Sequence, residues 1–193
     1  MVWICQKKVF SSNDISMKTI VYYYSHKGSN RFLAQRLASD LACDIEEIKP
    51  RLNVHLLMIM GLNLGNRALK TKVEDYDKII LCGPIWMGKL IVPLKNFVIK
   101  YQRKIKKLIF VSCCGSSFKD KDNKFGHNLV FNQVKSLLHH KCLHCEAFPI
   151  DLFAPAELKD DSAAFMKVHL NSENFMGEII PVYDALISRI NEL

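Results

Sequence analysis

Residues 76–88 read YDKIILCGPIWMG, an apolar run followed by a loop rich in glycine and proline. The run at 79–82 contains no charged residue, which is typical of a parallel strand covered on both faces. Gly83, Pro84 and Gly88 then interrupt the strand pattern and predict a turn. In open sheets of parallel strands, ligands bind beyond the carboxyl ends of the strands. This loop is therefore the first candidate for a binding site.

Strand patterns alternate with helix patterns on both sides of this segment. Strands are predicted at 19–24, 44–48, 76–82, 107–112 and 143–152, and helices at 29–42, 54–60, 93–101, 125–140 and 179–193. Such alternation predicts parallel strands that are joined by crossover helices on both faces. The predicted fold class is α/β, with a doubly wound sheet of five parallel strands.

Composition limits the possible partners. The 193 residues include 27 Lys and Arg against 19 Asp and Glu, a formal net charge of +8. No nucleic-acid motif accompanies these basic residues, so a solvated surface is favoured over nucleic-acid binding. No apolar run reaches the roughly 18–20 residues that span a membrane. The seven cysteines are odd in number and show no disulfide framework, which favours a reducing cytoplasm.

The domain prediction treats the first residues separately. Residues 1–16 lack the apolar segment of a signal peptide. Met17 stands directly before the first strand pattern, so residues 1–16 are either a loose N-terminal extension or sequence before the native start. Residues 17–193 show no linker, low-complexity tract or internal repeat, and we expect them to form a single domain.

The loop after the first strand has features of a phosphate cradle. Residues 25–31 read SHKGSNR and lead into a helix pattern. The free N–H groups and the dipole of a helix N-terminus attract anions. Three side chains could donate hydrogen bonds to phosphate and two could add positive charge. The donors are Ser25, Ser29 and Asn30, and the cations are Lys27 and Arg31. The alternative is an ordinary turn in which Ser29 or Asn30 caps the helix.

Trp86 would lie at the same edge of the sheet. A flat ring in this position is either a core anchor or a stacking surface for another ring. The flanking glycines leave room for a ligand near the backbone, which favours binding. A third loop, residues 112–117, reads SCCGSS and follows the fourth strand. The three loops are expected to meet, because the carboxyl ends of parallel strands share one edge.

These segments resemble those of flavodoxins. Residues 24–31, with Ala34, resemble the flavodoxin phosphate loop, and residues 75–97 look like the segment that ends in the flavin-stacking loop. Residues 112–117 are similar to the last flavin-contacting loop. The resemblance covers about residues 18–190 and implies the strand order 2-1-3-4-5.

The resemblance also implies one non-covalently bound FMN. The implied contacts are Ser25, His26, Lys27, Gly28, Ser29, Asn30, Arg31, Pro84, Ile85, Trp86, Met87, Gly88, Cys113, Cys114, Gly115 and Ser116. The implied function is electron transport or FMN-dependent NAD(P)H oxidoreductase activity. The expected partners are a redox protein, or NAD(P)H with a small-molecule acceptor, and the expected assembly is a monomer or homodimer.

The sequence departs from the flavodoxin pattern in two ways. Lys27, Ser29 and Asn30 stand where the family has Thr, Asn and Thr, which leaves fewer hydroxyls for a phosphate. The alternative function is therefore an FMN-free flavodoxin-fold module that acts in binding or regulation. Electron-carrying flavodoxins are typically acidic, whereas this chain is basic. Positive charge near the ring would favour its reduced form and make the midpoint potential less negative.

Cys142 and Cys145 form a lone C-x-x-C pair between the fourth predicted helix and the fifth strand. A structural zinc site usually has two such pairs, so no metal is expected here. Thioredoxin-like pairs open a helix after a strand, which this pair does not. Ordinary packing is the favoured interpretation.

Overall fold

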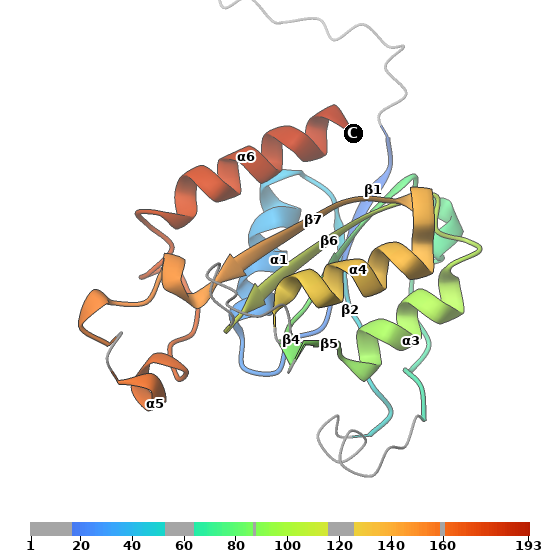
Figure 1. Cartoon of the computed structure of the whole chain (residues 1–193). Helices are drawn as coiled ribbons and strands as arrows, with labels where there is room; N and C mark the ends of the chain where they lie inside the picture. Colours follow the sequence, from blue (N-terminus) through green and yellow to red (C-terminus); the bar gives the residue numbers. More distant parts are fainter. Residues whose placement is uncertain (1–16, 53–63, 87, 116–125, 159–160) are drawn as a thin grey trace, which may run out of the picture.

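The computed structural model describes residues 17–52, 64–86, 88–115, 126–158 and 161–193. Its main sheet has five parallel strands in the order β2-β1-β3-β6-β7 (Figure 1). The strands are β1 (Thr19–Tyr23), β2 (Asp44–Glu47), β3 (Lys78–Cys82), β6 (Lys107–Cys114) and β7 (Cys142–Pro149). Taken in chain order, this is the predicted 2-1-3-4-5 arrangement, which is confirmed.

Two pairs of helices cover the two faces of the sheet. One face packs against α3 (Val92–Tyr101) and α4 (His127–Leu138), and the other against α1 (Ser29–Asp40) and α6 (Ile179–Glu192) (Figure 1). Alternate residues of β1 enter the two resulting cores, because successive side chains of a strand point to opposite faces. No helix within the described ranges is long and apolar enough to cross a membrane.

Short elements occupy the connections. A two-stranded antiparallel hairpin, β4 (Ile85–Trp86) and β5 (Lys89–Leu90), follows β3. Single 3-10 turns lie at η1 (Val73–Asp75), η2 (His139–Lys141), η3 (Ile150–Leu152) and η4 (Ala156–Leu158). The helix α5 (Ser162–Phe165) belongs to the long connection between β7 and α6, which lies beyond the arrowheads of β6 and β7 in Figure 1.

Several predicted boundaries differ from the observed ones. The predicted strand at 107–112 continues to Cys114, because residues 112–114 still pair with β7. The predicted strand at 143–152 ends at Pro149, where a 3-10 turn begins. The strand predicted at 76–82 begins at Lys78, after the turn η1. The predicted helix at 54–60 lies outside the described residues.

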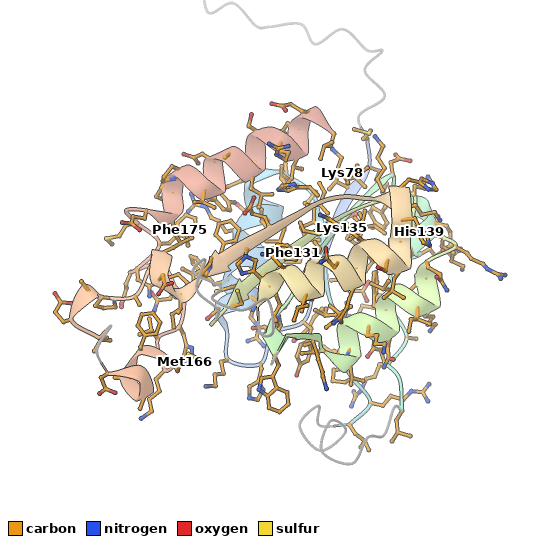
Figure 2. All side chains as sticks on the ribbon, viewed as in Figure 1. Lys78, Phe131, Lys135, His139, Met166 and Phe175 are labelled. Carbon is orange, nitrogen blue, oxygen red and sulfur yellow. The ribbon has the colours of Figure 1, made fainter. Side chains whose placement is uncertain are left out.

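Two lysines fix the end of α6 to the amino end of the sheet. Lys78, labelled in Figure 2, is 4 % exposed, and its Nζ donates a hydrogen bond to the carbonyl of Ile190. Lys107 Nζ donates to the carbonyl of Leu193 at 2.6 Å. The last carbonyls of a helix lack donors within the helix, and the helix dipole favours cations there. Burial lowers the pKa of Lys78.

Candidate functional site

A cavity of about 350 Å³ lies at the carboxyl ends of β1, β3 and β6. The loops after these strands form its walls together with residues of the connection at 150–178. Most of the predicted site residues line it. These are His26, Lys27, Ser29, Asn30, Pro84, Ile85, Trp86, Cys113, Cys114 and Gly115. The tertiary structure thus brings together the three loops that the sequence singled out.

Four other predicted site residues are not among those that line the cavity: Ser25, Gly28, Arg31 and Gly88. Gly28 and Gly88 instead shape the loops, since both have positive φ, at 106° and 65°. The last two predicted site residues, Met87 and Ser116, lie outside the described residues.

The first loop delivers the N-terminus of α1 to the cavity. Ser25 Oγ accepts a hydrogen bond from the N–H of Gly28 at 3.1 Å, which closes the turn. Gly28 is the N-cap residue, and no side chain caps the helix. The alternative interpretation, in which Ser29 or Asn30 caps the helix, is therefore wrong. The N–H groups of the first helical turn have no partner within the helix and form a binding surface for an anion.

Asn30 has a structural role that its sequence position did not reveal. Its side chain is 4 % exposed and bonds both backbone groups of Cys113. Nδ2 donates to the Cys113 carbonyl at 2.9 Å, and Oδ1 accepts from the Cys113 N–H at 2.9 Å. The amide thus joins α1 to β6 and fixes Asn30 in the cavity wall. These two bonds use Oδ1 and one of the two Nδ2 hydrogens.

The predicted cations separate in the structure. Arg31 turns toward the sheet edge, where its guanidinium lies 3.6 Å from the Glu47 carboxylate. It therefore does not supply the charge expected of it in the cavity. Lys27 and His26 are exposed and line the cavity, so basic side chains do lie beside the N-terminus of α1.

The hairpin β4–β5 holds Trp86 in the cavity wall. The indole is 38 % exposed. Gln133 of α4 anchors the hairpin, because its Oε1 accepts from the Leu90 N–H at 3.2 Å and its Nε2 donates to the Gly88 carbonyl at 3.3 Å. At Gly83 the chain approaches α3 so closely that a Cβ would lie 2.6 Å from Leu94 Cδ1. Contacts with α4 and α3 thus fix the backbone on both sides of Trp86.

The third wall begins inside β6 rather than in a loop. Cys113 pairs with Phe148 and Cys114 with Pro149 in the sheet, which corrects the expectation of a tight loop at the two cysteines. Burial raises the pKa of the Cys113 thiol, so this thiol stays protonated at neutral pH. Next to them, a Cβ at Gly115 would lie 2.7 Å from Met166 Cε. Met166 thus covers the backbone at Gly115, and Figure 2 shows it on the long connection.

Comparison with known proteins identifies the family. The family model described as "Flavodoxin domain" matches residues 20–157. This chain belongs to the flavodoxin domain family. No curated protein sequence matches it.

Solved structures agree with this flavodoxin domain in fold. A flavoprotein in complex with FMN from Lactobacillus acidophilus superimposes with a TM-score of 0.56 at 16% identity, over 68% of this chain and 93% of that one. Putative flavoproteins from Bacteroides uniformis and Bacteroides eggerthii both have TM-scores of 0.52, at 18% and 16% identity. They cover 69% and 79% of this chain and 90% and 99% of their own.

Some residues that line the cavity of this flavodoxin domain were not predicted from the sequence. The missed residues come from the strand ends and from the connection at 150–178, and they are Tyr24, Ile91, Ile150, Phe153, Met166, Val168 and His169. The connection is tied to α1, because the N–H of Leu170 donates to Ser29 Oγ at 3.1 Å. Its length was the available signal, since connections longer than about 12–15 residues are uncommon and often contribute to binding sites.

The chemistry of the cavity is divided between two ends. The N-terminus of α1, Ser29 and Lys27 offer donors and positive charge, whereas Ile85, Trp86 and the long connection offer apolar surface. Within the described ranges, no three His, Cys, Asp or Glu side chains gather as a metal site. The flavodoxin domain can therefore hold a planar, apolar group that carries an anionic end.

Proposed function

We propose that this flavodoxin domain binds one FMN in the cavity and uses it for electron or hydride transfer. The observation that carries the proposal is the meeting of an uncapped helix N-terminus and an indole in one cavity of about 350 Å³. Ligand cavities have volumes of roughly 300–1,000 Å³, so the volume of this cavity is within the range for a bound cofactor. The flavoprotein from Lactobacillus acidophilus, which has the same fold, is described in complex with FMN.

The phosphate would bind at the N-terminus of α1. The N–H groups of its first turn point out of the helix, and the dipole favours a negative group there. The Ser29 hydroxyl accepts from Leu170 and also bonds the Cys113 thiol, so its place at this end of the cavity is fixed. Lys27 adds a charge-assisted contact in place of the hydroxyls that the usual flavodoxin loop supplies. Asn30 would support this end through its two bonds to the backbone of Cys113.

The ring would lie against the apolar end of the cavity. Trp86 offers a flat surface for offset stacking, and Phe153 and Met166 close the wall contributed by the connection. When bound, FMN supplies the redox chemistry, and the protein supplies its position and electrostatic surroundings. Because the described residues that line this cavity include Lys27 and no Asp or Glu, they would favour a reduced ring more than those of an acidic flavodoxin do.

The partners are a second part of the proposal. An electron carrier would exchange electrons with a redox protein, whereas a reductase would use NAD(P)H and a small-molecule acceptor. The net charge of +8 favours acidic protein partners or anionic small molecules. All six described cysteines are free thiols, which suits work in the reducing cytoplasm.

The visible absorption spectrum of the purified protein, with and without added FMN, tests the proposal. We expect flavin bands at near-stoichiometric amounts, or strong quenching of FMN fluorescence on titration. Riboflavin, which lacks the phosphate, is the matched control and should bind more weakly. Equal affinity for both would contradict the phosphate site. A colourless protein that fails to quench FMN fluorescence would leave the fold intact and favour the FMN-free module.

A further inference from the structure

The two cysteines of the C-x-x-C pair lie in contact at the other end of the sheet. Cys142 Sγ and Cys145 Sγ are 3.6 Å apart. They belong to the first half of β7, whereas the cavity lies beyond its carboxyl end. The pair is therefore separate from the proposed FMN site, and its chemistry does not depend on whether FMN binds.

The contact depends on an irregularity in β7. In a regular strand, residues i and i+3 point to opposite faces and lie about 10 Å apart. Here the pairing moves from Leu108 with Cys142 directly to Ile109 with His144, so Leu143 is an extra residue. Bulges of this kind are rare between parallel strands and concentrate at edges and functional sites.

The extra residue turns both cysteines to one face. Cys142 and Cys145 both pack on the core beneath α4, whereas Leu143 packs on the opposite core. On that opposite side, His144 Nε2 and Glu146 Oε2 are 3.0 Å apart. A disulfide needs an S–S distance of about 2.05 Å, so the two sulfurs must approach by only about 1.5 Å. Rotation of the two cysteine side chains can bring the sulfurs closer by this distance.

The two thiols differ electrostatically. Either thiol can donate in their 3.6 Å contact, and this contact lowers the pKa of Cys142 and raises that of Cys145. Lys135 of α4, labelled in Figure 2, adds positive charge that favours both thiolates. Both cysteines are only partly buried, and β7 is an edge strand, so a small reagent can approach. Cys142 is thus the better nucleophile, and Cys145 is the resolving thiol beside it.

We propose that Cys142 and Cys145 form a reversible dithiol–disulfide site that reacts with low-molecular-weight disulfides. The Cys142 thiolate attacks one sulfur of the small disulfide and forms a mixed disulfide, and the first small thiolate leaves. Cys145 then loses its proton, and its sulfur attacks Cys142 Sγ, which releases the second small thiolate. The protein dithiol is oxidised by two electrons, and the small disulfide is reduced to two thiols, which take up the two protons.

The second step becomes easier once the first has occurred. While Cys142 is a thiolate, its charge opposes ionisation of Cys145. In the mixed disulfide that charge is gone, while Lys135, which favours the Cys145 thiolate, and Glu146, which opposes it, both remain. The resolving thiol therefore ionises more readily when its attack is needed. The reverse reaction, with an excess of the small thiol, reopens the pair.

A tryptic digest isolates the pair on one peptide. Cleavage after Lys141 and Lys159 yields residues 142–159, which contain no cysteine other than Cys142 and Cys145. The protein is equilibrated with mixtures of reduced and oxidised glutathione, alkylated and digested. As oxidised glutathione increases, we expect the doubly alkylated form of this peptide to be replaced by an unlabelled form. The mass of the unlabelled form should be two units below that of the unlabelled dithiol peptide. Cys43, alone on residues 37–51, is the internal control and should stay alkylated.

Single variants test the order of attack. Cys145→Ser should accumulate a mixed disulfide of Cys142 with one glutathione, because the resolving thiol is gone. Cys142→Ser should form the mixed disulfide on Cys145 at least several-fold more slowly. Lys135→Gln should slow the reaction of Cys142 in the otherwise unchanged protein. The proposal is overturned if the wild-type peptide stays doubly alkylated, or carries glutathione without forming the internal bond.

Discussion

The Asn30 side chain bonds both backbone groups of Cys113, which lies 83 residues away in the chain, with both distances 2.9 Å. This pair joins the first turn of α1 to the end of β6 in the cavity wall. The Cys82 thiol lies close by, 3.5 Å from the Asn30 carbonyl. The ends of β3 and β6 and the start of α1 are thus held together where the cavity begins.

Asn30→Ala should lower the free energy of unfolding by about 2–4 kcal/mol, because two buried backbone groups of Cys113 lose their partners and each costs roughly 1–3 kcal/mol. Urea denaturation of the wild type and the variant measures the loss. Arg31→Ala is the control, since it removes the contacts of a half-exposed side chain with Glu47 and Tyr23 and should change stability by less than about 1 kcal/mol. Equal unfolding midpoints for Asn30→Ala and the wild type would contradict the structural role.

Trp86→Ala should weaken FMN binding by about tenfold or more, because stacking a planar ring on an aromatic side chain contributes roughly 1–3 kcal/mol. The indole is 38 % exposed, so we expect little change in thermal stability. Titration of FMN fluorescence gives the affinity. Ile99→Ala, a 44 % exposed residue of α3 that does not line the cavity, is the control and should bind FMN as the wild type does. An unchanged affinity in Trp86→Ala would remove the indole from the proposed ring site.

Lys27→Glu should make the midpoint potential of the bound FMN more negative. Replacing a positive by a negative charge at the cavity changes the free energy of the ring's reduction by an amount on the order of 1 kcal/mol at low ionic strength. For one electron this corresponds to a change of about 40 mV in the midpoint potential. Potentiometric titration measures the shift. Arg103→Glu changes the net charge equally. Arg103 lies in the turn between α3 and β6, at the amino end of β6, whereas the cavity lies at the carboxyl end. If both variants shift the potential equally, only the net charge matters and Lys27 has no local effect.

The stability of the protein should fall between about pH 10 and 12, partly because of Tyr22. Burial raises the pKa of Tyr22 to about 12 from its ordinary value of 10.0, and its hydroxyl lies 2.7 Å from Thr71 Oγ1. The neutral side chain therefore favours the folded state below pH 10, and this contribution is lost as the pH rises through 12. Tyr22→Phe should show a shallower decline in urea denaturation over this range. Parallel declines in the two proteins would show that Tyr22 does not contribute.

Local patterns in the sequence were enough to predict the strands of the sheet and its four flanking helices. A buried parallel strand must be apolar along its length, and a covering helix must carry an apolar stripe. Elements such as β3 and α6 can therefore be predicted from short stretches of sequence. The carboxyl ends of parallel strands share one edge, so the sequence alone was enough to assign the three loops to one place. The family resemblance then supplied the strand order, which the structure confirms.

Only the tertiary structure decided what the polar side chains of these loops do. The hydrogen bonds of Asn30 and Ser29 are to partners 83 and 141 residues away, and Arg31 turns to Glu47 on a neighbouring strand. A local pattern carries no record of such partners. The same holds for the wall at 150–178 and for the contact of Cys142 with Cys145, which depends on the pairing register between β6 and β7. The sequence by itself predicted that the three loops lie at one end of the sheet, and long-range packing decided which of their atoms face the cavity.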